Sequence, residues 1–183
     1  MKATEIIEQI KEDANICIAV LDGPVDLTHP CFNKAKITQI ETLVSGIDEE
    51  GPGAHHGTHV ASLIFGQHDS PISGIAPGCR GLIIPVFADG PDGSVAPCSQ
   101  IDLAHAITQA VEQGAHIINI SGGELVSSSE PHPLLDKAVR LCAENGVLIV
   151  AAVGNDGCQC LHVPAAISST LAVGAMDAQG LPL

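Results

Sequence analysis

The chain has 183 residues, 45% of them hydrophobic and 15% charged, which is enough apolar material for one domain with a packed core. Twenty-one acidic residues against seven basic ones give a formal net charge of -14, so nucleic acid would be repelled along most of the surface. Three Phe without any Tyr or Trp offer few platforms for stacking bases, and the sequence has no run of roughly 18 apolar residues that would cross a membrane.

Short, unbroken apolar runs alternate along the chain with amphipathic segments, as in buried parallel strands and their crossover helices. In chain order the pattern predicts a leading helix at Thr4 to Glu12, a strand at Ile16 to Leu21, a helix at His56 to Phe65, a strand at Gly81 to Val86, a helix from Ser99 to Gly114, a strand at Ile117 to Ile120, a helix at Pro133 to Glu144, and strands at Val147 to Val153 and Thr170 to Ala175. We therefore predict an α/β fold, with a doubly wound, mostly parallel sheet and helices on both faces, in a single domain over residues 1–183. Ligands of such sheets bind beyond the carboxyl ends of the strands.

Asp22 directly follows the first predicted strand, in the sequence Asp22-Gly23-Pro24. A carboxylate at this edge of a sheet is half desolvated and is suited to holding a cation or orienting an imidazole. Asp-Gly-Pro also favours a turn by itself, so a purely structural role stays open.

His56 lies where the second predicted helix begins, in the sequence Ala54-His55-His56-Gly57-Thr58-His59. The positive end of a helix disfavours imidazolium and keeps a histidine neutral, while a carboxylate such as Asp22 would stabilise the cation once it forms. The alternatives are a solvated cluster of histidines and a metal site at His56 and His59. H-x-x-H lacks the Glu of the zinc-protease helix, so no metal or other cofactor is expected.

Asn155 follows the fourth predicted strand, in the sequence Val153-Gly154-Asn155-Asp156-Gly157. A side-chain amide at this point can donate a hydrogen bond to a developing oxyanion. Asn-Asp-Gly is equally a good turn.

Seven cysteines are present, and because the number is odd at least one thiol stays free. Cys158 and Cys160 form a C-x-C pair without a second cluster, which is a weak zinc signal. The other five are scattered, several of them in apolar segments where Cys acts as a small hydrophobe. Buried or idle thiols are the main expectation, and one or two disulfides are the alternative.

The first residues carry four acids, Glu5, Glu8, Glu12 and Asp13, and lack the apolar stretch of a signal peptide. A cytoplasmic location is therefore expected.

Four motifs taken in order resemble one family. They are a strand ending in V-L-D at Asp22, H-G-T-H-V-A beginning at His56, 34 residues later, I-N-I-S-G-G ending at Gly123, and A-A-V-G-N ending at Asn155. This ordered set is similar to that of the subtilisin-like serine proteases, and the resemblance extends from about Ile16 to Asp177.

The resemblance implies roles for the residues of these motifs. Asp22 would fix the tautomer of His56, His56 would act as general base and then acid, and Asn155 would donate to the oxyanion. The substrate-binding residues that it implies are Ser121, Gly122, Gly123 and Gly154 around the primary specificity pocket, and Gly93, Ser94 and Val95 on an edge strand that binds the peptide upstream of the scissile bond.

The sequence differs from the family at the nucleophile. The family's serine lies in a G-T-S-x-A segment, and no such segment occurs among these 183 residues. Ser121 is not expected to replace it, since it matches the substrate-binding strand and has no helix N-terminus behind it. We therefore expect a domain truncated at its C-terminus, with the nucleophilic Ser elsewhere, after self-cleavage following Leu183, trimming, or retention of a second piece by packing. The alternative is a catalytically inactive module that binds peptides by strand addition.

Further features narrow the resemblance. The interval from His59 to Ile75 is too short for the calcium loop of many secreted members, and no pro-region is visible. The interval from Asp22 to His56 is too short for the helical insertion that macrocyclising members carry. The combination resembles the proteases of cyanobactin (patellamide-type) maturation. Among these it resembles the N-terminal type, which frees the N-terminus of the core peptide. That type implies cleavage of a ribosomal precursor peptide after Glu, which frees the N-terminus of a core peptide, with this precursor and the protein's own C-terminal fragment as partners.

His162 stands at the position that the resemblance assigns to the floor of the primary pocket. We hypothesise that it accepts an acidic residue, Glu or Asp, before the scissile bond, through a hydrogen bond or as imidazolium. The alternative is a solvent-facing loop histidine.

Overall fold

The structure is a computed structural model that describes residues 13–44, 50–90, 94–96, 98–125, 130–155 and 162–182. The leading helix expected at Thr4 to Glu12, the predicted substrate-binding Gly93, and Cys158 and Cys160 lie outside the described residues.

A parallel sheet forms the centre of the molecule, and its six strands are in the order β10-β8-β6-β1-β3-β2. The strands are β1 (Cys17–Asp22), β2 (Lys36–Gln39), β3 (Arg80–Pro85), β6 (Ile117–Ile120), β8 (Leu148–Ala152) and β10 (Thr170–Val173). All five pairings between them are parallel, which confirms the predicted fold class. The five predicted strands are present to within one or two residues at each end, and β2 is an addition that the sequence pattern missed.

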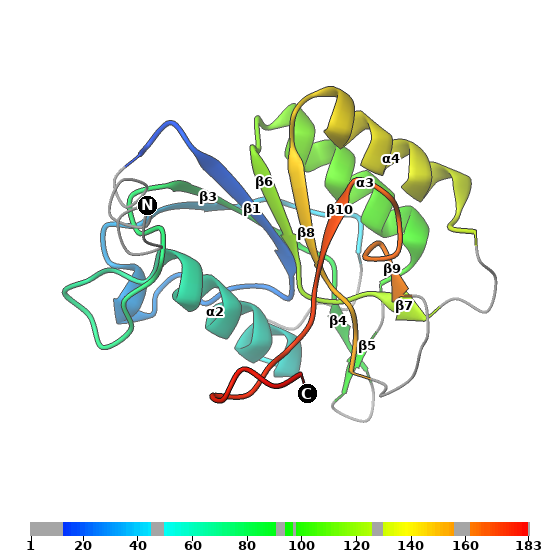
Figure 1. Cartoon of the computed structure of the whole chain (residues 1–183). Coiled ribbons are helices and arrows are strands. Elements are labelled where there is room, and N and C mark those ends of the chain that lie inside the picture. Colours follow the sequence, from blue (N-terminus) through cyan, green and yellow to red (C-terminus); the bar gives the residue numbers. More distant parts are fainter. Residues whose placement is uncertain are drawn as a thin grey trace.

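Helices cover both faces of this sheet (Figure 1). α2 (Pro52–Phe65) packs on one face, and α3 (Gln100–Glu112) and α4 (Pro133–Glu144) pack on the other. Ser99 caps α3 as predicted, because its hydroxyl oxygen accepts a hydrogen bond from the Asp102 N–H at 3.1 Å. The predicted start of α2 at His56 is wrong by one turn, since the helix begins at Pro52, where the fixed φ of proline suits a first helical position.

The smaller elements lie at the edges of the sheet. A short 3-10 helix, η1, spans Pro30–Phe32. Two antiparallel pairs join β4 (Ala88–Asp89) to β5 (Val95–Ala96) and β7 (Glu124–Leu125) to β9 (His162–Val163). No helix in the described part of the chain is long and apolar enough to cross a bilayer.

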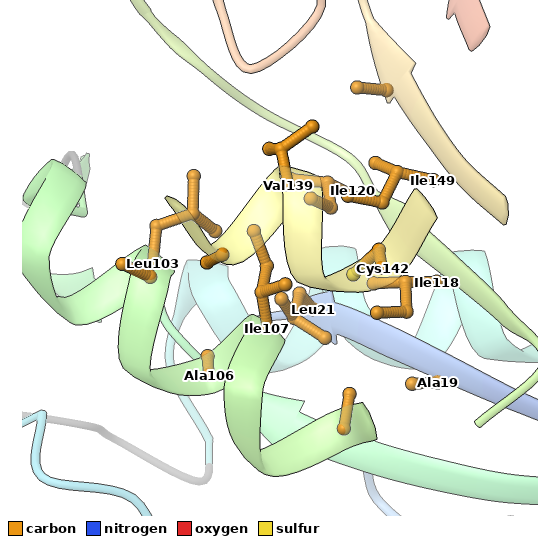
Figure 2. Packing of buried hydrophobic residues seen from close by; sticks show 14 of the residues in the cluster. Ala19, Leu21, Leu103, Ala106, Ile107, Ile118, Ile120, Val139, Cys142 and Ile149 are labelled. Carbon is orange, nitrogen blue, oxygen red and sulfur yellow. The ribbon is translucent and has the colours of Figure 1, made fainter. Parts of the chain in front are cut away.

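Two apolar cores lie on opposite sides of the sheet. The larger one packs Leu103 and Ile107 of α3 and Val139 of α4 against strand residues that include Leu21 and Ile149 (Figure 2). The smaller core lies under α2, where Phe65 is fully buried. Side chains of β1 alternate between the two cores because successive residues of a strand point to opposite faces.

The face that carries α2 is only partly covered by the described residues. Leu171 and Val173 of β10 are in register with Val150 and Ala152 of β8, so these side chains share the face that Leu148 also belongs to. Leu148, Leu171 and Val173 are 43%, 51% and 47% exposed. The described part of the chain therefore leaves the β8 and β10 side of this face open.

Candidate active site

Asp22 and His56 form the centre of the candidate site. Asp22 is the last residue of β1 and is fully buried, and its Oδ1 lies 2.7 Å from Nδ1 of His56. The same oxygen accepts a hydrogen bond from the Gly23 N–H at 2.7 Å. Because the carboxylate accepts, the imidazole proton is held on Nδ1, and Nε2 is left free to accept a proton. The pair has the geometry of a general base with its orienting acid.

The electrostatics of His56 follow from this contact. The hydrogen bond that His56 donates to Asp22 raises the pKa of His56 above its usual 6.5, partial burial opposes the rise, and the negative charge of Asp22 adds to it. The sequence led us to expect that the helix terminus would favour the neutral imidazole. His56 is instead the fifth residue of α2, where the effect of the helix dipole is weaker, and the carboxylate determines the direction of the shift.

Two glycines let the backbone segments of the site approach closely. A Cβ on Gly23 would overlap the Gly53 carbonyl, and a Cβ on Gly57 would overlap the Gly23 carbonyl. The turn after β1 therefore packs directly against the first two turns of α2. This backbone contact brings Asp22 and His56 together from positions 34 residues apart.

Asn155 lies just beyond the end of β8 and is exposed. Since β8 and β1 belong to one parallel sheet, Asn155 and Asp22 follow strands that end at the same edge. The preceding Gly154 has a φ of +91°, a conformation that glycine adopts without strain. The structure therefore places the predicted oxyanion donor on the same edge of the sheet as the predicted base.

The predicted substrate-binding residues fall into two groups. In the first, the Ser121 hydroxyl oxygen accepts a hydrogen bond from the Asn119 amide at 2.8 Å. A Cβ on Gly123 would lie 2.8 Å from the Val163 carbonyl oxygen, and one on Gly154 would lie 2.6 Å from Nε2 of His162. The structure thus brings the segment ending at Gly123, Gly154 and His162 together around β9.

The second group is the hairpin of β4 and β5, which contains Ser94 and Val95. Val95 is paired with Asp89, and the Gly90 N–H donates to the Ser94 carbonyl oxygen at 2.7 Å. Both residues are therefore held on a short antiparallel ribbon, as an edge strand for peptide binding requires.

His162 does not lie in a solvent-facing loop. It is the first residue of β9, is half-buried, and is in register with Leu125 of β7. Its ring lies against Gly154, where a methyl group would be too close. This packing places the imidazole beside Gly154, with the Cβ of His162 near Gly123.

The sequence analysis missed two residues at the same edge, Phe87 and Asp89. The ring of Phe87 lies against Gly122, and Asp89 Oδ1 accepts a hydrogen bond from the Gly53 N–H at 2.8 Å. Both follow β3 within four residues. Their position beyond the carboxyl end of a buried strand was the signal that could have identified them.

The described residues offer no group of three or more His, Cys, Asp or Glu side chains that could hold a metal ion. Five cysteines in the described ranges form no disulfide, namely Cys17, Cys31, Cys79, Cys98 and Cys142, and all but Cys98 are buried. Burial raises the pKa of Cys142 to about 11 and that of Cys98 to about 12, the latter with added repulsion from Asp102 and Glu124. These two thiols therefore stay protonated at neutral pH.

Comparisons with known proteins agree with this geometry. Residues 13–181 match the Subtilase family (Peptidase_S8), and the chain belongs to that family. One similar structure is that of a serine-to-alanine mutant of the protease domain of PatA, the patellamide maturation protease. It is 54% identical with a TM-score of 0.87, over 95% of this chain and 62% of that chain. A self-cleaved form of the PatA protease domain is 55% identical with a TM-score of 0.81, over 94% of this chain and 62% of that chain.

Two further relatives extend the comparison. The prenylagaramide maturation protease PagA is 52% identical with a TM-score of 0.85, over 100% of this chain and 62% of that chain. Subtilisin Savinase of Lederbergia lenta is 33% identical over 90% of this chain and 56% of its own length. The predicted resemblance to subtilases and to the patellamide-type maturation proteases is confirmed, and the chain spans less than two thirds of each relative.

Proposed function

We propose that this chain forms part of a subtilase-type serine endopeptidase that cleaves a ribosomal precursor peptide. The observation that carries the proposal is the 2.7 Å contact between Asp22 and His56 at the carboxyl edge of the sheet, in a chain 52% and 54% identical to maturation proteases. The proposed substrate is a peptide, and the proposed product is a core peptide with a free N-terminus. A cytoplasmic location stays a prediction.

In the proposed mechanism, Nε2 of His56 takes the proton from a serine hydroxyl as its oxygen attacks the scissile carbonyl. Asp22 stabilises the imidazolium, and the side-chain N–H of Asn155 donates to the oxyanion. His56 then gives its proton to the leaving amine, and the peptide C–N bond breaks to leave an acyl-serine. Water, deprotonated by His56, attacks the acyl-serine, and the proton returns to the serine oxygen as the ester bond breaks.

The nucleophilic serine, on this proposal, comes from polypeptide other than these 183 residues. The Gly-Thr-Ser segment of the family is absent from the sequence, and Ser121 is engaged with Asn119. The side of the sheet that the described residues leave open, with Leu148, Leu171 and Val173 exposed, supports the proposal because an apolar face of this kind requires a cover. We propose the protein's own C-terminal segment as that cover, joined to the chain or retained after self-cleavage.

This proposal is tested on the protein as isolated from its source, by labelling with a fluorophosphonate probe and measuring intact masses under denaturing conditions. Labelling of a longer chain, or of a second polypeptide that accompanies this one, supports the endopeptidase. A preparation that binds precursor peptide without any labelled species contradicts it. That outcome would favour the non-catalytic peptide-binding module, the alternative consistent with the missing motif.

For specificity, we propose that His162 selects an acidic residue, Glu in particular, before the scissile bond. Support comes from its half-buried ring against Gly154 and its position in β9 beside Gly123. A hydrogen bond to a charged group contributes about 1.5–3 kcal/mol. We expect His162→Ala in the complete protease to lower kcat/KM for a Glu peptide about 10- to 100-fold relative to the matched Leu peptide. If the ratio of the two peptides stays unchanged, His162 does not read the acidic residue.

A further inference from the structure

Asp89 connects the predicted substrate-binding hairpin to the helix that carries His56. Its backbone lies in β4 and is paired with Val95 of β5. Its Oδ1 accepts a hydrogen bond at 2.8 Å from the N–H of Gly53, the second residue of α2, which is 36 positions away in the sequence. A single side chain thus bridges two parts of the candidate site.

The start of α2 depends on this contact because the helix has no cap of its own. The N-cap residue is Gly51, which has no side chain that could cap the helix, and the first turn contains no acidic residue. By contrast, α3 and α4 are capped by their own N-cap side chains, Ser99 and His132. A carboxylate near a helix N-terminus interacts favourably with the free N–H groups and with the helix dipole.

The local sequence makes room for the carboxylate. A Cβ on Gly51 would overlap the Asp89 carboxylate, and one on Gly53 would lie 3.4 Å from its Oδ1. Gly51 therefore lets Asp89 approach the backbone of the first turn, and Gly53, where a Cβ would only touch the carboxylate, supplies the N–H donor. The other support of this turn is the backbone of Gly23, which packs against the Gly53 carbonyl.

His56 lies three residues after Gly53, within the same stretch of helix. At about 1.5 Å of rise per residue, this places it roughly 4.5 Å farther along the axis, so a tilt of the first turn also moves the imidazole. The His56 side chain is 49% exposed, so neighbouring residues pack against only about half of it. Its position depends on Asp22 and on the placement of the helix itself.

We propose that Asp89 is a positioning residue, which fixes the first turn of α2 against the β4–β5 hairpin and thereby holds His56 in place relative to a peptide bound along Ser94 and Val95. The inference rests on the proposed protease function. Asp89 does not contact the reacting atoms, and its effect is exerted through the helix. Misplacement of a catalytic group by about 1 Å can cost about 100-fold in rate.

The test compares Asp89→Ala and Asp89→Asn in the complete protease. The asparagine keeps an oxygen that accepts from the Gly53 N–H, whereas the alanine does not. Asp102→Ala is the matched control, because Asp102 accepts from Ser99 in the first turn of α3, a helix with no proposed catalytic residue. The measurements are kcat and KM on one peptide, melting temperature, and the proton NMR signal of the His56 Nδ1–H bonded to Asp22.

We expect Asp89→Ala to lower kcat about tenfold with KM changed less than about threefold, and to shift or broaden the Nδ1–H signal. Asp89→Asn should restore most of kcat, and Asp102→Ala should lower only the melting temperature. The inference is overturned if Asp89→Ala behaves like Asp102→Ala, or if Asp89→Asn is no better than Asp89→Ala. If the unmodified protease cleaves no peptide, the proposed function fails, and the NMR signal in the same variants still decides whether Asp89 positions His56.

Discussion

The contact between Asp22 and His56 makes the substitution Asp22→Asn the most direct test of the site. Asparagine fills the same volume, but a single Asp22 oxygen accepts from both Nδ1 of His56 and the Gly23 N–H, and an amide that kept its oxygen at that point would leave the imidazole proton on Nδ1. Its amide N–H₂ can instead donate to Nδ1 of His56, which would move the imidazole proton to Nε2. In that tautomer His56 cannot accept a proton from the nucleophile, and kcat should fall about 10⁴-fold, as for the equivalent substitution in a chymotrypsin-type triad.

The distance between Asp22 and His56 supports a fall in kcat of this size. Two unit charges 2.7 Å apart attract by about 6 kcal/mol at an effective dielectric of 20, and the exposed half of the ring reduces that value through solvent screening. A 10⁴-fold fall in rate corresponds to about 5 kcal/mol. The loss of the ion pair that forms in the transition state therefore has the magnitude needed.

The pH dependence gives this prediction a second, independent readout. Since the hydrogen bond that His56 donates to Asp22 raises the pKa of His56 above 6.5, activity should fall as the pH drops through that raised pKa and the base becomes protonated. In Asp22→Asn the acidic limb should move to lower pH, because burial alone remains and favours the neutral ring. The assay is kcat/KM against pH for one peptide with the complete protease.

Folding stability provides the control for this reasoning. A histidine pKa that is raised in the folded state stabilises the fold below the pKa of the unfolded chain, and the contribution is lost as the pH rises through the folded value. Urea unfolding should therefore show Asp22→Asn to be destabilised more at pH 5.5 than at pH 9. Retention of more than about 1% of kcat/KM, or an acidic limb that does not move, would refute the assigned roles of Asp22 and His56.

The remaining predictions concern other parts of the site and the core. Asn155→Ala should lower kcat about 100- to 1,000-fold with little change in KM, a figure that comes from a subtilisin; a loss below threefold in steady-state assays would contradict an oxyanion role. Gly154→Ala should displace the His162 ring and strain a backbone at a φ of +91°, which should cost about 1–2 kcal/mol and reduce the preference for Glu over Leu peptides. Ile107→Ala, at a fully buried position, should lower the free energy of urea unfolding by about 2–5 kcal/mol and leave the titration of His56 unchanged in NMR.

The central elements were predictable from the sequence because their signals are local. Val20 and Leu21 belong to an unbroken apolar run, and such a run identifies a strand buried on both faces. Ser99 followed three residues later by Asp102 identifies the start of a helix. β2 gave no such signal, since Lys36–Gln39 alternates between exposed and half-buried residues at the edge of the sheet, where burial contributes little to the pattern.

The contacts of the site were less predictable, because they depend on how separate segments approach one another. The pairing of Asp22 with His56 was anticipated from the order of the motifs, and the structure gives its distance. The start of α2 was not, because neither Gly51 nor Gly53 offers a side-chain cap, Gly53 lowers the helix propensity of the first turn, and the carboxylate at this end comes from Asp89 in a different strand. No local pattern contains the information that these three residues meet.

The two faces of the sheet contribute differently to stability and to catalysis. The face covered by α3 and α4 contains the larger core, and residues such as Ile107 and Ile149 are fully buried there. Within the described ranges, the other face is covered by α2, the helix that carries His56, together with η1 and neighbouring loops, and its β8 and β10 side is left open. The buried carboxylate of Asp22 and the glycine contacts at Gly23 and Gly57 lie where β1 and the turn after it meet α2. The base and its orienting acid are therefore arranged before the rest of the proposed triad is added, which is the preorganisation that electrostatic catalysis requires.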